Sequence, residues 1–182
     1  MKYLKKFEQN NTITILNYSN QKLTELPELP DSLKILYCEY NNLTQLPEIP
    51  NLLKILNCKY NNIIYLPKLP NSLEYLDCSN NDLTELPKLP NTLKNLYCEN
   101  NNLAQLPKLP NTLKKLYCEN NNLAQLPKLP DSLEILVCYN NNLPYNNLNE
   151  YKNYIKKHKD LIEKYGYDEA MNIINNVNKY NL

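Results

Sequence analysis

Six cysteines recur at a spacing of twenty residues, and the thiol is the most reactive side chain that this sequence repeats. An even number of cysteines is typical of disulfide-linked secreted domains, and neighbours in a parallel stack would meet the Cα separation of a bridge. A zinc site needs close pairs such as Cys-x-x-Cys, which this spacing does not provide. The leading interpretation is core packing, because a buried Cys behaves as a small hydrophobe, with disulfides or a metal as the alternative. The six are Cys38, Cys58, Cys78, Cys98, Cys118 and Cys138.

Other residue types that support catalysis are scarce. Gly166 is the single glycine, so the chain cannot form a glycine-rich phosphate loop, and His158 is the single histidine. All 20 basic residues are lysines and 19 residues are acidic, so the net charge of +1 creates no strong field. Lysine also lacks the rigid fork with which arginine binds phosphates and guanines. We therefore expect no catalytic residues, no cofactor, no metal, no enzymatic activity and no nucleic-acid ligand.

The cysteines belong to a twenty-residue internal repeat, which begins at Asp31 and recurs up to Asp131. Each copy reads Leu-x-x-Leu-x-Cys, and this alternation places the last Leu and the Cys on one face of a short strand. A lone strand cannot bury that face, whereas parallel stacking at about 4.8 Å per strand buries every copy in one core. Two prolines in each copy, such as Pro47 and Pro50, hold the return path extended.

The repeated string resembles the leucine-rich-repeat family, consensus LxxLxLxxNxL, with Cys in place of the third Leu. Its short period and its LPxLP segment are similar to the repeats of bacterial effectors, and to similar viral repeats. The resemblance covers residues 13–143 and implies a leucine-rich-repeat solenoid. In such a solenoid a parallel β-sheet lines the concave face, the convex side is polyproline-like, and α-helices cap the C-terminus. The effector subtype that is a ubiquitin ligase carries a large catalytic domain after its repeats, and only about forty residues follow here. We therefore do not transfer that activity.

The expected organisation has three parts. Residues 1–12 are an N-terminal cap segment, residues 13–143 hold seven strands of which the first is degenerate, and residues 144–182 form a helical hairpin. Apolar residues recur at helical spacing from Leu148 to Tyr165, Gly166 suits a helix end, and Asp168 can cap a second helix. The chain shows no signal peptide and no apolar run of membrane-spanning length, so we expect a soluble, monomeric, cytoplasmic protein.

The solvent-facing side of the predicted strands, called here the concave face, is where the copies differ. Residues 91–110 and 111–130 are identical except for Asn95 and Lys115, and both of these lie on this face. Tyrosine provides large amphipathic contact area and is enriched at interfaces. The concave face is therefore the candidate partner-binding site, although its tyrosines could instead only stiffen the strands. The candidate residues are Tyr37, Glu39, Tyr75, Asp77, Tyr97, Glu99, Lys115, Tyr117, Glu119 and Tyr139.

Two further columns have a structural interpretation. Asn41 and its equivalents fall at the family's asparagine position, where the amide can bond the backbone of neighbouring turns. The row Lys68, Lys88, Lys108 and Lys128 is expected to be solvated, with an anionic partner as the alternative. The predicted function is thus a non-enzymatic protein-interaction module. The alternatives are an effector or recruiter acting on ubiquitin or signalling machinery in a host cytosol, or a repeat protein without a single fixed ligand.

Overall fold

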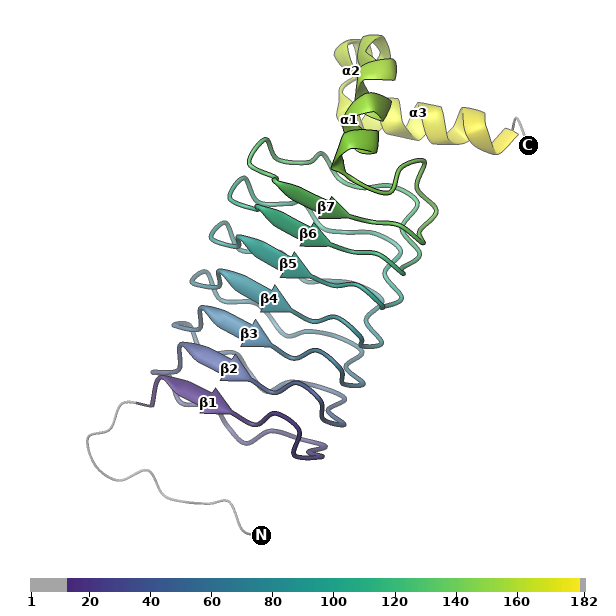
Figure 1. The fold of residues 1–182 in the computed structure, drawn as a ribbon. Coiled ribbons are helices and arrows are strands. Elements are labelled where there is room, and N and C mark those ends of the chain that lie inside the picture. The colour runs from purple at the N-terminus through teal and green to yellow at the C-terminus, as the bar shows by residue number, and fades with distance from the viewer. Residues whose placement is uncertain (1–12, 181–182) are drawn as a thin grey trace.

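Seven short strands stack in one parallel sheet, and three helices follow them (Figure 1). The computed structural model describes residues 13–180, so the N-terminal cap segment predicted for residues 1–12 lies outside the described residues. The strands pair in chain order, which confirms the predicted parallel-sheet solenoid. They are β1 (Ile15–Asn17), β2 (Ile35–Tyr37), β3 (Ile55–Asn57), β4 (Tyr75–Asp77), β5 (Asn95–Tyr97), β6 (Lys115–Tyr117) and β7 (Ile135–Val137).

The register of the sheet equals the period of the sequence. Leu36 pairs with Leu56, and Leu56 pairs with Leu76, so each residue lies beside its counterpart twenty positions later. Each strand ends at the residue before the Cys position, and the third residue beyond the strand adopts a left-handed conformation, as at Asn100 with φ of 54°. Asparagine tolerates this region better than most residues do. The turn therefore limits every strand to three residues and starts the return path.

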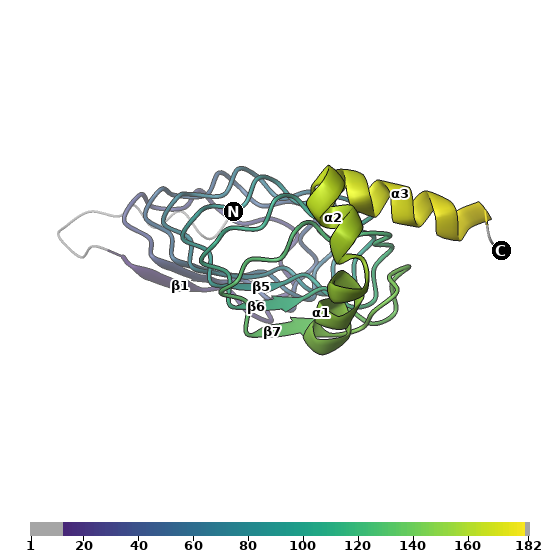
Figure 2. The same cartoon turned by 90° about the horizontal axis from the view of Figure 1, so that it is seen from above.

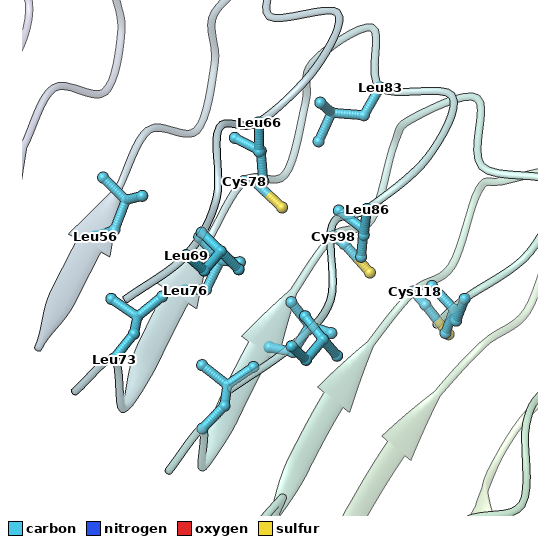
Figure 3. Packing of buried hydrophobic residues seen from close by; sticks show 14 of the residues in the cluster. Leu56, Leu66, Leu69, Leu73, Leu76, Cys78, Leu83, Leu86, Cys98 and Cys118 are labelled. Atoms are coloured by element: carbon cyan, nitrogen blue, oxygen red, sulfur yellow. The ribbon is translucent and has the colours of Figure 1, made fainter. Parts of the chain in front are cut away.

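The core is a continuous column of leucine and cysteine side chains between the sheet and the return path (Figure 3). Leu76 and Cys78 from β4 and its extension point inward, and Leu83 meets them from the return segment. All six cysteines are fully buried and free, which confirms the core-packing interpretation. Burial raises the pKa of the Cys38 and Cys138 thiols to about 12 and that of the other four well above the ordinary value.

An asparagine ladder joins successive turns. The Asn101 Oδ1 accepts a hydrogen bond from the Leu83 N–H at 3.0 Å, and its Nδ2 donates to the carbonyls of Cys78 and Cys98, each at 3.1 Å. The same pattern repeats at Asn61, and the predicted structural role is therefore confirmed. Each amide satisfies backbone groups of two turns that would otherwise be buried without a partner.

A second ladder, which the sequence analysis did not predict, runs along the loop before the strands. The Thr92 hydroxyl contacts the carbonyl oxygens of Asn71 and Leu73 at 2.8 and 2.7 Å, and Thr112 repeats this contact one turn later. Leu52 occupies the equivalent position in the third turn and is exposed, so the ladder is interrupted there.

The C-terminal segment forms three helices, α1 (Leu148–Lys157), α2 (Lys159–Tyr165) and α3 (Tyr167–Tyr180), where the sequence predicts two. The break falls at His158, whose N–H bonds the Ile155 carbonyl while its ring Nδ1 lies 2.9 Å from the Tyr154 carbonyl. The ring thus takes the carbonyl that a continuous helix would bond to the His158 N–H. Gly166 ends α2 with φ of 77°, whereas α3 already begins at Tyr167, so Asp168 lies inside its first turn.

Aromatic side chains connect these helices to the last turn. Tyr145 and Tyr151 are buried against the end of the leucine core with ring centroids 5.1 Å apart. The Tyr167 hydroxyl donates to the Leu126 carbonyl at 3.1 Å, while α3 itself projects beyond the stack (Figure 2). Between residues 13 and 180, no helix combines the length and the apolar character needed to cross a membrane.

Replacing a ladder asparagine should destabilise the solenoid strongly. In Asn101→Ala, one buried N–H and two carbonyls lose their partner, so we expect the free energy of unfolding to fall by about 2–3 kcal/mol. Urea unfolding followed by circular dichroism measures this value. The adjacent Asn102→Ala, at an exposed side chain, is the control and should change it by less than about 0.5 kcal/mol.

The buried thiols should be unreactive while the fold is intact. We expect a colourless thiol reagent such as Ellman's disulfide to label none of the six cysteines within minutes at pH 8, because each is buried and protonated. All six should react after addition of guanidinium. Rapid labelling of one cysteine in the native protein would contradict its placement in the core.

Candidate functional site

The concave face is built from three outward positions in each turn. The first and third residues of each strand lie on the outer side, although Asn57 and Asp77 are buried there by their neighbours. The middle Leu is buried in β2 to β7, and the residue after each Cys returns to the outer side. In Figure 2 the strands form one layer of the molecule and the return segments form the other. Because the backbone is fixed by in-register pairing, the outer side chains stand in three columns with one strand spacing between neighbours.

Three of the predicted tyrosines form a stack across neighbouring strands. The ring centroids of Tyr97 and Tyr117 are 4.9 Å apart and nearly parallel, with 16° between the planes. Tyr75, one column over on β4, lies 5.4 Å from Tyr97 at 38°. All three side chains are half-buried, so part of each remains accessible to solvent. We call Tyr75, Tyr97 and Tyr117 the tyrosine stack.

Two glutamates stand beside the tyrosine stack, each two residues beyond a stacked ring. Glu119 exposes only 9% of its surface, and Glu99 is half-buried. The Oε2 atoms of both are shielded from solvent and have no hydrogen-bond partner among the described residues. We call Glu99 and Glu119 the carboxylate pair.

Burial changes the acidity of the carboxylate pair. Desolvation raises the pKa of Glu99 to about 7, and the negative charges of Asp77 and Glu119 add to this increase. Desolvation likewise raises the pKa of Glu119. Removing a carboxylate from water without a compensating partner disfavours its charged form, which is why both pKa values move upward. No cationic side chain among the described residues opposes this rise at either carboxylate.

Asp77 differs from the carboxylate pair because the chain satisfies it internally. The Ser79 hydroxyl donates to Asp77 Oδ1 at 2.7 Å, the Ser79 N–H adds a bond of 3.2 Å, and Lys59 Nζ lies 3.9 Å from Oδ2. Burial still raises the pKa of Asp77, while these contacts oppose that rise. Asp77 therefore holds neighbouring turns together more than it offers a free charge to a partner.

The remaining predicted residues lie on the same face but outside this cluster. Tyr37 and Glu39 are two turns before β4, Lys115 is half-buried in the first column beside Ile135, and Tyr139 is exposed after β7. The sequence prediction therefore places all ten residues on one face, and the structure divides them into a compact centre and a periphery.

Two surface residues that the sequence analysis missed are Tyr40 and Tyr60. Both rings are exposed and stacked, with centroids 4.7 Å apart and 10° between their planes. Both residues occupy the left-handed turn position, with φ of 57° and 52°, where later turns have asparagine. A bulky residue is unfavourable there. The sequence signal was available, because tyrosine interrupts an otherwise regular asparagine column at these two positions.

The lysine row lies on the opposite side, on the convex return path. Lys88 and Lys108 help to line a hollow there, together with Leu89, Leu109 and Pro110. These lysines are exposed, as expected for a solvated row. Within residues 13–180, no three acidic, cysteine or histidine side chains are grouped in a way that would hold a metal ion.

The raised pKa of Glu99 predicts a pH-dependent stability. The carboxyl has an ordinary value of 4.5 and a folded value of about 7, so the folded state retains its proton to higher pH. The stability contributed by this group is therefore present below pH 4.5 and is lost as the pH rises to about 7. Glu99→Gln should raise the free energy of unfolding at pH 8 by on the order of 1 kcal/mol, a value reduced for its half-exposed position, and should change little at pH 4.5.

Urea unfolding of both proteins at the two pH values checks this prediction. Glu48→Gln, on the exposed return path, makes the same charge change and should leave stability unaltered at either pH. Equal effects of the two substitutions at pH 8 would show that net charge, and not the desolvation of Glu99, determines the result.

Comparison with known proteins agrees with this architecture. A family model described as Leucine Rich Repeat matches residues 72–91. No curated protein matches the chain significantly. Among solved structures, YopM from Yersinia enterocolitica WA-314 is 41% identical with a TM-score of 0.62, over 67% of this chain and 26% of that one. YopM from Yersinia pestis, titled a leucine-rich effector protein, is 40% identical with a TM-score of 0.62, over 70% and 43%.

A Shigella effector leucine-rich-repeat domain is 28% identical with a TM-score of 0.64, over 81% of this chain and 76% of that one. The chain thus spans less than half of either YopM chain but about three quarters of the Shigella domain. The twenty-residue register, the asparagine ladder and these similarities lead to one assignment. The chain has a leucine-rich-repeat fold, and its short repeats are similar to those of bacterial effectors.

Proposed function

We propose that this protein is a non-enzymatic interaction module that binds a protein partner on its concave face. The observation that carries the proposal is the tyrosine stack, three half-buried rings held on a rigid sheet beside the carboxylate pair. Stacked tyrosines lose little conformational entropy on binding and offer both apolar area and a hydroxyl. The similarity to effector repeats supports an interaction role.

The distribution of sequence variation supports the same proposal. The leucine, cysteine and asparagine columns are nearly constant from turn to turn, whereas the outward columns change from Ile to Tyr, Asn or Lys. The twin turns differ only at Asn95 and Lys115, in the first outward column next to the tyrosine stack. A face that only stiffened the strands would have no reason to differ there, because both residues occupy the same position of identical turns.

The chemistry of the described residues argues against catalysis by this chain. Its thiols are buried and their pKa values are raised, which is the opposite of an activated nucleophile. Free thiols also suit a reducing compartment, so we place the protein in a cytosol, and in a host cytosol if it is an effector. Recruitment of ubiquitin or signalling machinery is one form that the partner's role could take. We propose a monomer that acts without nucleic acid.

Substitution of the tyrosine stack tests this proposal. Bead-bound wild-type protein should retain from a cell lysate a defined partner that Tyr97→Ala/Tyr117→Ala loses by at least about tenfold, because truncating interface tyrosines removes 2 kcal/mol or more. Quantitative mass spectrometry of the retained proteins measures the ratio. Circular dichroism should confirm that the variant remains folded.

The matched control is Tyr65→Ala/Tyr165→Ala, which also removes two tyrosines, both exposed and both away from the concave face. This variant should retain the partner. A partner that survives the loss of Tyr97 and Tyr117 but not the loss of the control tyrosines would refute binding at the concave face.

A further inference from the structure

We propose that the carboxylate pair and the tyrosine stack together form a receptor for an arginine side chain of the partner. This inference rests on the proposed function, because it specifies the chemistry of what binds at the concave face. The guanidinium would lie flat against a tyrosine ring and donate hydrogen bonds to the glutamate two residues further along the same turn. A tyrosine is followed two residues later by a glutamate in three turns, at Tyr37 with Glu39, Tyr97 with Glu99 and Tyr117 with Glu119, and the Oε2 of each glutamate lacks a partner among the described residues.

The carboxylate pair lacks hydrogen-bond donors for two of its oxygens. Glu119 is nine-tenths buried, and within the described part of the chain its Oε2 atom has neither a donor nor solvent contact. One strand away, the Glu99 Oε2 atom also has neither a donor nor solvent contact. A buried carboxylate without a donor is costly, and a charge-assisted hydrogen bond from outside is what removes the penalty. The orphaned oxygens therefore indicate a cationic ligand.

The described part of the chain does not supply this cation. Lys59 Nζ is directed at Asp77 Oδ2, 3.9 Å away, and also lies 5.9 Å from the centre of the Tyr40 ring. Lys115 forms no ion pair among residues 13–180 and stands in the first outward column, whereas the carboxylate pair stands in the third. The grouping also does not suit a metal ion in the described residues. Because no side chain among residues 13–180 provides the missing charge, we assign it to a partner.

Arginine fits the geometry better than lysine. Its guanidinium is planar, is weakly hydrated, stacks on aromatic faces and can donate two parallel bonds to one carboxylate. Tyr97 and Tyr117 stack on each other with centroids 4.9 Å apart, which leaves no room for a group between them, and Tyr75 lies 5.4 Å from Tyr97. The face of Tyr117 that is directed away from Tyr97 has no aromatic partner among the described residues, and Glu119 accompanies that ring. A lysine ammonium is a compact point charge that would use the carboxylate but gain less from the ring.

Charge complementarity favours the same occupant. The outward columns of the seven turns hold the carboxylates Glu39, Asp77, Glu99 and Glu119 but only the lysines Lys59 and Lys115. The concave face is therefore negative, although the whole chain has a net charge of +1. A basic, extended segment of a protein partner is the ligand that such a face attracts and orients.

Binding of defined peptides tests the receptor. The probe is a fluorescent eight-residue peptide of alternating arginine and serine, compared with the lysine peptide of equal charge, by anisotropy at pH 8 and about 150 mM salt. The wild type should bind the arginine peptide at least about fivefold more tightly than the lysine peptide. Glu99→Gln/Glu119→Gln should weaken arginine binding about tenfold or more and remove the preference.

The matched control is Glu28→Gln/Glu48→Gln, which changes the net charge equally on the exposed return path and should bind like the wild type. Equal weakening by both double variants would overturn the proposal, because binding would then follow net charge alone. Equal affinity for both peptides in the wild type would also overturn it, because a point charge would be sufficient. Circular dichroism of each variant ensures that weakened binding does not reflect unfolding.

The same variants separate this inference from the proposed function. If the partner retained in the lysate experiment is lost with Tyr97→Ala/Tyr117→Ala but kept with Glu99→Gln/Glu119→Gln, the concave face binds a protein and the arginine receptor is refuted. If the partner is kept by both variants, the concave-face function itself fails. Loss with both variants, together with the arginine preference, supports both.

Discussion

The rest of this structure depends on the hydrogen bonds that each ladder asparagine makes to its own turn and to the preceding turn. A three-residue strand cannot form a fold alone, and its turn leaves backbone groups buried near the core. Asn101 bonds the backbone of its own turn and that of the preceding turn, so it fixes both the turn and the register. Because the register is fixed, equivalent leucines and cysteines of successive turns lie beside one another in the core. The outward residues line up in three columns for the same reason.

The fold could be predicted from the sequence because the residues that determine it recur in every repeat. Leu36, Cys38 and Asn41 return every twenty residues, and the structure places each column where the alternation of a strand requires. The interruption at His158 depends on a ring that competes with the main chain for one carbonyl, and no periodicity reveals that contact. The outward position of Glu119 was likewise predictable, but its near-complete burial was not, because burial depends on how neighbouring side chains lean.

The concave face and the core meet opposite physical requirements. Next to the core, the asparagine ladder satisfies backbone groups such as the Leu43 and Leu83 N–H, and the described turns repeat that arrangement with little change. On the concave face Glu99 and Glu119 are left desolvated and Tyr40 and Tyr60 adopt a backbone conformation that suits asparagine better. Residues that oppose stability in an otherwise regular scaffold are those most readily explained by binding.

The in-register stack also has a consequence for how such a molecule changes over generations. Each strand pairs only with its immediate neighbours, so copying one whole twenty-residue unit creates no mismatch in the ladders on either side. Residues 91–110 and 111–130 are such a pair of near-identical units. A further copy would extend the molecule by about 4.8 Å and add one more ring and one more carboxylate to the open side. The length of an elongated ligand that this face can contact can therefore increase one repeat at a time. Neither the core nor the C-terminal helices need to change.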